Sequence, residues 1–450
     1  MLAARRGTFW WVLVASFAAV FAVLLVVAVT QWRDERSGEQ AGSLPVDFRT
    51  AAGTSTDELI GTLQRRLREN PEDLGSRVDL ANAYLQKVRE TGDPTLYAKA
   101  DDLLDGAGKP NATSPEVFAA RGALDLARHR FADAMEQGKR ALVLDPESAR
   151  YHGIVGDAQI ELGMYDRAIE SYQEMVDLRP DFDSFSRVSH ARELYGDPEG
   201  AIEAMEFALQ SGSGATENMA WAHAQLGNLW FGLGDLEEAE KAYARSTETL
   251  DDYAPALAGR AKVAAAEGEL ERAADLYRRA FDRMPLAEYA IALGDVHAEM
   301  GDKQMAAGQY DLVRQIDELN RTNGVNTDLE IALFYADHGV QTRASLEKAR
   351  SAYEARPSIH AADVLAWTLY KDGRYEEAQK YSSEALRLGT RDPLMLFHAG
   401  MISRELGKNE QAREHLQKAL DLNPHFSVLH ADTAARALDD LENVKPGGGQ

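Results

Sequence analysis

The sequence predicts an all-α fold: a right-handed α-solenoid of about ten helix pairs, preceded by one N-terminal transmembrane helix. Two observations carry this prediction. A glycine followed five residues later by an alanine recurs eight times, at steps of 33 to 38 residues, and one long uncharged apolar run lies near the N-terminus. A fixed period of this size is typical of solenoids, in which each helix pair buries its apolar faces against the next pair.

The apolar run predicts a transmembrane anchor at residues 9–32, after a basic N-terminus at residues 1–8. The 22 residues from Phe9 to Thr30 carry no charge, and about 20 apolar residues in a helix cross the hydrocarbon core of a bilayer. The alternative is a cleaved signal peptide, whose apolar core is shorter. The basic N-terminus favours a single-pass cell-membrane protein whose repeat domain is extracytoplasmic, and the opposite orientation stays open.

Two segments are predicted between this anchor and the repeats. Residues 33–55 are polar and lack helical periodicity, which indicates a flexible linker. Ser55 and Glu58 then have the spacing of a capping box. We therefore expect a leading helix in residues 56–73 that ends before Pro71.

The recurring small residues have physical reasons to recur. The glycine is expected to end the first helix of each pair in the left-handed conformation, where a Cβ is penalised. The alanine is expected where the two helices come closest, faced by a small residue such as Gly156, and prolines such as Pro180 should end the second helix. The structural positions predicted in this way are the pairs Gly163 and Ala168, Gly234 and Ala239, Gly268 and Ala273, Gly373 and Ala378, and Gly407 and Ala412.

With its small-residue, glycine, alanine, aromatic and proline positions, the chain resembles a tetratricopeptide repeat (TPR) protein. The resemblance implies a TPR solenoid at residues 74–426, a C-terminal capping helix at residues 427–442 and a disordered tail at residues 443–450. The two longest steps are expected to be longer loops between repeats. The C-terminal repeat also resembles a group of bacterial TPR proteins without an assigned activity. In this register the repeats begin near Leu74, Pro115, Ala149, Phe182, Ala220, Ala254, Ala287, Val325, Ile359 and Pro393.

Composition and motifs predict no catalytic residue, no metal site and no cofactor. The chain contains no cysteine, which excludes disulfides, thiolate zinc sites and the paired CxxC metal knuckle of some membrane-anchored TPR proteins. Its eleven histidines show no short metal-ligand spacing, and the nearest pair, His425 and His430, lacks an identifiable third ligand. The formal charge of −24 excludes a general affinity for nucleic acid, because phosphate binding needs clustered Lys and Arg.

TPR geometry implies a concave groove lined by set positions of the first helices, and two apolar clusters fall there. Exposed aromatic residues would anchor a partner's apolar side chains, and an Asn can bond the backbone of a peptide. The alternative is that these side chains pack between neighbouring helices. The predicted partner-binding residues are Trp221, Asn228 and Phe231 in one cluster and Trp367, Tyr370, Phe397 and Met401 in the other.

These inferences predict a non-catalytic, membrane-anchored TPR scaffold that mediates protein–protein interactions at the cell envelope. Its partner would be a protein that places a peptide or a helix in the concave groove. One alternative is a cytoplasm-facing TPR adaptor that delivers a client to a membrane enzyme. A second is a metal-handling or enzymatic protein that uses His and Asp residues of the groove.

Overall fold

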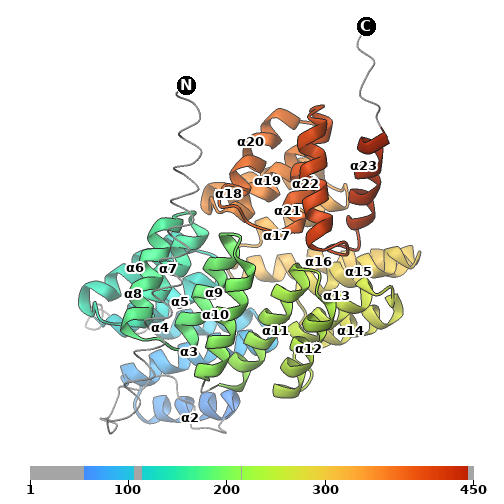
Figure 1. The fold of residues 1–450 in the computed structure, drawn as a ribbon. Helices are drawn as coiled ribbons and strands as arrows, with labels where there is room; N and C mark the ends of the chain where they lie inside the picture. The colour runs from blue at the N-terminus through green and yellow to red at the C-terminus, as the bar shows by residue number, and fades with distance from the viewer. Residues whose placement is uncertain (1–54, 106–113, 214, 444–450) are drawn as a thin grey trace, which may run out of the picture.

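The computed structural model describes residues 55–105, 114–213 and 215–443, which form 22 α-helices and no strand (Figure 1). A leading helix is followed by ten helix pairs, numbered here as repeats 1 to 10, and a last helix ends the series. The predicted all-α solenoid is confirmed for the described residues. The helices are α2 (Thr56–Glu69); the pairs α3 (Leu74–Thr91) and α4 (Thr95–Asp105), α5 (Pro115–Ala127) and α6 (Phe131–Leu144), α7 (Ala149–Glu161) and α8 (Tyr165–Leu178), α9 (Phe182–Leu194) and α10 (Pro198–Ser211), α11 (Thr216–Gly232) and α12 (Leu236–Thr249), α13 (Ala254–Ala266) and α14 (Leu270–Arg283), α15 (Ala287–Glu299) and α16 (Lys303–Thr322), α17 (Asp328–Asp337) and α18 (Thr342–Ala355), α19 (Ile359–Lys371) and α20 (Tyr375–Ala385), α21 (Pro393–Glu405) and α22 (Asn409–Leu422); and α23 (Ala431–Asn443).

Side-chain caps fix the start of several helices. At α2 the Ser55 hydroxyl accepts a hydrogen bond from the backbone N–H of Glu58, and the Glu58 carboxylate accepts one from the N–H of Ser55. This is the capping box expected from the sequence. Asp73 caps α3 and Asp235 caps α12, each by accepting a bond from the N–H three residues further on. These bonds satisfy donors that have no partner within their own helix.

The turn inside each pair contains a residue in the left-handed region, and the turn of repeat 8 contains two, Gly339 and Gln341. Gly163 has a φ of 67°, and its N–H donates to the carbonyl of Ile160 at 3.0 Å, which ends α7. In repeat 2, His129 takes the same position with a φ of 59°, an uncommon conformation for a residue that carries a Cβ. Positive φ values of 69° to 80° recur at Gly234, Gly268, Gly373 and Gly407.

The two helices of a pair pack closely around the repeated alanine and the ring that follows it. A Cβ on Gly156 of α7 would lie 2.4 Å from the ring of Tyr172 in α8, and Gly227 stands in the same relation to Tyr243. The glycines therefore make room for a ring one turn after the alanine, and not for the alanine as we expected. The alanines with no exposed surface include Ala168, Ala239, Ala273, Ala378 and Ala412.

At the two places where successive repeat glycines are furthest apart in the sequence, the extra residues lie largely in helices. The first helix of repeat 5, α11, begins at Thr216, ahead of the expected repeat start at Ala220. The second helix of repeat 7, α16, continues for 20 residues to Thr322. The expectation of longer loops is wrong here, because neither extension contains a proline or a glycine to stop the helix.

Successive pairs share apolar clusters that cross the repeat boundaries. One cluster joins Phe185 of repeat 4 to Leu226 and Leu229 of repeat 5. At the C-terminus another joins Leu416 of α22 to Leu438 of α23, so α23 covers the apolar face of the last repeat. A helix pair of this size cannot bury its apolar faces alone, so the core is continuous along the chain. The helix α23 starts four residues later than the predicted capping helix and ends one residue later, at Asn443.

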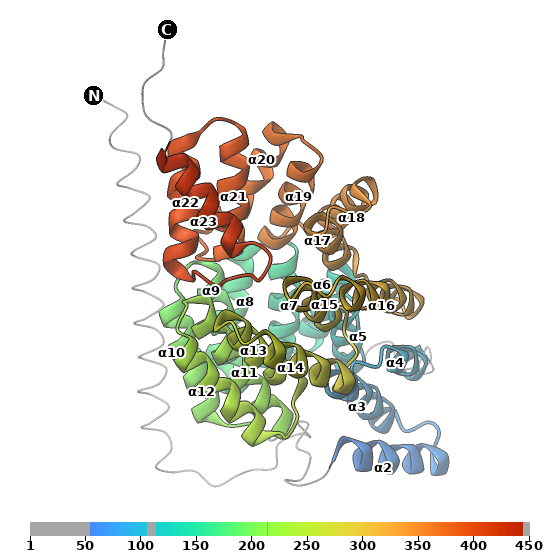
Figure 2. The same cartoon turned by 90° about the vertical axis from the view of Figure 1, so that its right-hand side faces the viewer.

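The solenoid coils until repeats 8 to 10, orange to red, lie beside repeats 3 to 5, teal to green (Figures 1 and 2). This contact is part of a longer line of contacts, which we call the seam. Along it, the turns inside repeats 1 to 5 meet the ends of repeats 6 to 10 or the connections that follow them, in the same order. The residues that meet are Gly92 with Met284, His129 with Asn326, Gly163 with Pro357, Gly196 with Gly389, and Gly234 with Leu422.

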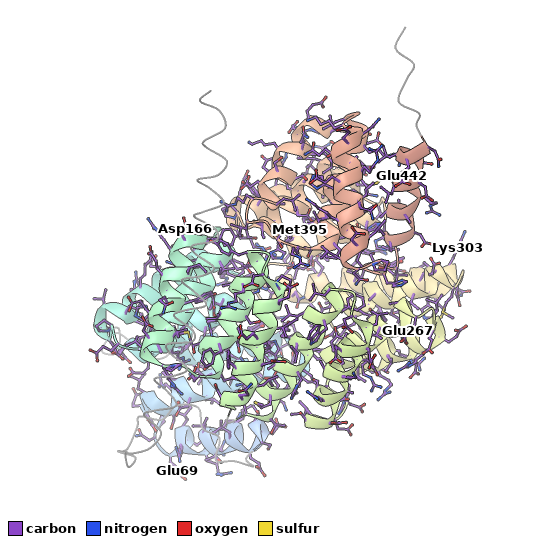
Figure 3. The ribbon with its side chains drawn as sticks, viewed as in Figure 1. Glu69, Asp166, Glu267, Lys303, Met395 and Glu442 are labelled. Carbon is purple, nitrogen blue, oxygen red and sulfur yellow. The ribbon has the colours of Figure 1, made fainter. Side chains whose placement is uncertain are left out.

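Hydrogen bonds and apolar contacts hold the seam together. The buried backbone N–H of Ile359 donates to the Tyr165 hydroxyl at 2.7 Å, and the amide of Asn423 donates to the carbonyl of Phe231 at 2.7 Å. Met395 lies in an apolar cluster with Tyr165 and Ile359. It is labelled in Figure 3, where repeats 8 to 10 meet repeats 3 to 5. The seam is therefore a packed and bonded contact between distant parts of the chain.

The turns inside repeats 6 to 10 have no such cover from the described residues. A Cβ on any of their glycines would meet nothing within 4 Å. The same repeat position is thus buried in one half of the solenoid and open in the other. These open positions are Gly268, Gly301, Gly339, Gly373 and Gly407.

The predicted cell-membrane location is not supported and is corrected. Among residues 55–105, 114–213 and 215–443, no helix is long and apolar enough to cross a bilayer. The longest, α16, carries six charged side chains in its 20 residues, whereas a membrane helix of this length must be predominantly apolar. The basic N-terminus at residues 1–8, the predicted anchor at residues 9–32, the linker up to residue 54 and the tail from residue 444 lie outside the described residues.

Candidate functional site

The first predicted cluster lies on one face of α11, which we call the α11 face and define by Trp221, Asn228 and Phe231. The spacing of seven and three residues brings all three to the same side of the helix. Each side chain is partly exposed. Trp221 meets Phe182 of the preceding repeat edge-on, with ring centroids 6.4 Å apart. The two aromatic residues are thus anchored at their base by the core and still present surface to solvent.

The amide of Asn228 is held by its own repeat. Its Oδ1 accepts a hydrogen bond from the Tyr243 hydroxyl at 2.8 Å, and its Nδ2 donates to Gln225 at 3.3 Å. The same tyrosine bond recurs at the equivalent position in two other repeats, from Tyr172 to Asp157 and from Tyr310 to Asp295. The Asn228 oxygen is therefore occupied, and the remaining N–H of its Nδ2 is the group with which it could bind a peptide backbone.

The second predicted cluster lies mostly in the core. Trp367, Phe397 and Met401 are only 2%, 1% and 7% exposed. Tyr370 is partly exposed and stacks on Trp367, with centroids 4.7 Å apart and an interplanar angle of 5°. The chain that leads into α23 covers this cluster, and Phe426 packs on Phe397. The structure therefore places these three side chains between helices, the alternative considered from the sequence, and not on an exposed surface.

A group of polar side chains, of which three are buried and Asp337 is partly buried, lies beside Trp367, and we call it the histidine cluster: Asp337, Asp363, His398 and His430. The Asp337 Oδ1 accepts hydrogen bonds from Trp367 Nε1 at 2.8 Å and from His430 Nε2 at 3.0 Å. Nδ1 of His398 bonds Oδ2 of Asp363 at 2.9 Å. The His398 ring stacks on Trp367 at 4.2 Å and has no exposed surface.

Electrostatics keep Asp337 ionised. Burial raises the pKa of Asp337, but the hydrogen bond from His430 and the nearby imidazoles outweigh burial, so the pKa is lowered. Asp337 is therefore a carboxylate at neutral pH. Lys371 lies over the Trp367 ring, with its Nζ 4.8 Å from the centroid, and burial lowers the pKa of this ammonium group.

Sequence reasoning missed this cluster. In the sequence, the nearest histidine to His430 is His425, and no third ligand for this pair can be identified. In the structure His425 is exposed, and the neighbours of His430 come from α17 and α21, far away in the sequence. No short motif joins such positions, because the helix pairs that bring them together are stacked elements of different repeats.

These features define a class: stacked helix pairs that form an extended solenoid and present a partly aromatic helix face. Residues 119–181 and 364–425 match the family model described as the tetratricopeptide repeat. These two stretches of the chain therefore contain TPR repeats. TPR repeats are typical of protein-interaction scaffolds, which are in general not catalytic.

Two curated relatives match parts of the chain. It is 26% identical over 215 residues to the protein CTR9 homolog of Arabidopsis thaliana, which covers 45% of this chain and 19% of that protein. It is 23% identical over 235 residues to the TPR repeat-containing protein YpiA of Bacillus subtilis (strain 168), which covers 52% of this chain and 47% of that protein. The chain thus spans less than half the length of either relative.

Among solved structures, the chain is similar to the APC/C hetero-tetramer Cut9–Hcn1. The two are 16% identical, the match covers 86% of this chain and 67% of that chain, and the TM-score is 0.38. The likeness is one of general helical architecture.

Proposed function

We propose that this protein is a non-catalytic TPR scaffold whose α11 face binds an extended segment of a partner protein. The observation that carries the proposal is the exposure of Trp221 and Phe231 on one helix face in the middle of the repeat series. Aromatic residues anchored in a core and open on one side are common centres of binding energy in interfaces. The free N–H of the Asn228 amide lies between them and would donate to a carbonyl of the partner's backbone.

A partner segment would therefore combine apolar side chains with an accessible backbone. Such a segment places one apolar residue against each ring and leaves its carbonyls free to accept the Asn228 bond. The net charge of −24 argues against a strongly acidic partner, because like charges would repel during approach.

Site-specific photo-crosslinking tests the proposal. A photoreactive phenylalanine analogue replaces Trp221, or in a second protein Val143, which is 83% exposed on α6 in repeat 2 and serves as the control. We expect crosslinks from position 221 that map by mass spectrometry to one extended segment, and a synthetic peptide of that segment should bind the purified protein.

Alanine variants then measure the contribution of the α11 face. Changing Trp221→Ala together with Asn228→Ala should weaken binding of the synthetic peptide by tenfold or more, because anchor residues contribute about 2 kcal/mol or more each. Val143→Ala should leave binding unchanged. If a double variant with the helix content of the wild type binds the peptide as tightly as the wild type, the α11 face is not the interaction surface.

A further inference from the structure

From the histidine cluster we infer a binding site for one divalent transition-metal ion, with Asp337, His398 and His430 as its ligands. One possible ligand atom of each residue lies within 4.8 Å of the others. Two imidazole nitrogens and one carboxylate oxygen form a ligand set that suits Zn²⁺ and related ions. The inference goes beyond the scaffold function and does not depend on it.

The strongest single observation is the state of His398. This side chain has no exposed surface, and its Nε2 has no hydrogen-bond partner among the described residues. A buried polar atom left without a partner costs about 1–3 kcal/mol. Because Nδ1 of His398 is already bonded to Asp363, Nε2 is the nitrogen left to act as a ligand beside Asp337 and His430. A metal ion at this point would give Nε2 the partner that the fold leaves out.

The surroundings of His398 are those of a metal-binding imidazole. Asp363, itself only 5% exposed, accepts the hydrogen bond from Nδ1 of His398 at 2.9 Å. This bond keeps the proton on Nδ1 and leaves the Nε2 lone pair free. A carboxylate behind a histidine ligand recurs in zinc sites, where it orients the ring and makes it more basic. The stacking of Trp367 on the ring fixes its plane further.

His430 and Asp337 would supply the other two ligands by giving up the hydrogen bond between them. Without a metal, His430 Nε2 lies 3.0 Å from Asp337 Oδ1 as a hydrogen-bonded pair. With a metal, the imidazole carries its proton on Nδ1, and both Nε2 and the carboxylate turn their lone pairs to the ion. Zinc ligands lie about 2.0–2.2 Å from the metal, so ligand atoms approach to about 3.3 Å of one another. Side-chain rotations that bring the ligand atoms closer together by up to about 1.5 Å would therefore suffice.

The position of the ligands assigns the ion a structural role. Asp337 ends α17 in repeat 8, His398 lies in α21 of repeat 10, and His430 precedes α23. One ion would thus tie the segment before the capping helix to repeats 8 and 10. Three protein ligands leave a fourth position of a tetrahedral site for water or for a group from a partner.

Metal uptake by the full-length protein, without any histidine tag, tests the inference. The protein is stripped with a chelator, dialysed and titrated calorimetrically with ZnCl₂. We expect one Zn²⁺ per chain and a higher melting temperature of the loaded protein. In a parallel sample Co²⁺ should give the strong visible absorption of a tetrahedral site with nitrogen ligands. A stripped wild type that takes up neither ion in stoichiometric amount would overturn the inference, whatever the variants do.

Variants locate the ion. Asp337→Asn and His398→Gln should each weaken Zn²⁺ binding by at least 100-fold, because each removes a ligand. Asp363→Asn should weaken it by about 10–100-fold, since it acts only through His398. The matched control is His425→Gln, which removes an exposed imidazole five residues from His430 and should bind as the wild type does. Equal binding by the Asp337 and His425 variants, with both folded by circular dichroism, would refute the assigned ligands.

Discussion

Replacing the turn glycines by alanine tests how much the seam stabilises the solenoid. Gly163 and Gly268 occupy the same position of different repeats and have φ values of 67° and 80°. A Cβ on Gly163 would lie 2.3 Å from the carbonyl oxygen of Pro357 across the seam, whereas a Cβ on Gly268 would meet nothing within 4 Å. The two substitutions therefore share a backbone cost and differ in the contact across the seam.

The magnitudes follow from the two terms. An alanine in the left-handed conformation costs about 1–2 kcal/mol at either position. At Gly163 the connection after α18 must also move, which breaks the buried bond from the Ile359 N–H to the Tyr165 hydroxyl. Leaving this N–H without a partner costs a further 1–3 kcal/mol or so. We therefore expect Gly163→Ala to lower the free energy of unfolding by about 2–5 kcal/mol and Gly268→Ala by about 1–2 kcal/mol.

Urea unfolding followed by tryptophan fluorescence and by far-ultraviolet circular dichroism measures both losses on the same scale. The result that refutes the reasoning is an equal loss for the two variants, since the seam contact would then contribute nothing measurable. Gly196→Ala offers an independent repetition, because its Cβ would lie 2.2 Å from the carbonyl oxygen of Gly389.

Two further predictions concern single polar groups. Tyr165→Phe should lower the free energy of unfolding by about 1–3 kcal/mol, because it removes only the acceptor of the buried Ile359 N–H. The control is Tyr353→Phe, which removes a hydroxyl bonded to the side chain of Glu384 and should lower the free energy of unfolding by less. The urea midpoints of both variants test this difference. Asp125→Asn should stabilise the protein at pH 7.5, because burial and then the charge of Asp133 raise the pKa of Asp125 to about 6. A carboxyl pKa that is raised in the folded state lowers the free energy of unfolding above pH 6, and this loss disappears as the pH falls toward the unfolded pKa near 4. The gain in melting temperature of the variant should therefore disappear between pH 7.5 and pH 4. A gain that is independent of pH would contradict this cause.

Local features of the fold could be predicted because they depend on near neighbours in the sequence. The positive φ of Gly163 and the burial of Ala168 follow from the needs of one turn and one helix pair. The repeat period does not show that the extra residues extend α11 and α16, because only the absence of a proline or glycine allows these helices to continue.

Features that depend on distant neighbours could not be predicted. Trp367 and Asn228 occupy equivalent repeat positions, yet Trp367 is buried because the chain before α23 folds over it. The histidine cluster needs residues from α17, α21 and the segment before α23 to meet. The seam depends on small rotations between repeats that add up over half of the chain, and no single repeat encodes that sum.

The seam also sets an order of events on the ribosome. Tyr165 and its partner Ile359 are 194 residues apart. At a synthesis rate of about 5–20 residues per second, Tyr165 would be made roughly 10–40 seconds before its partner. Until the segment that covers it has been made, each turn of repeats 1 to 5 would be as uncovered as the described residues leave the turns of repeats 6 to 10. The nascent N-terminal half would thus expose a row of uncovered turns to which another protein could bind. Fast completion of the C-terminal half would protect the chain from pairing with a neighbouring chain through these turns.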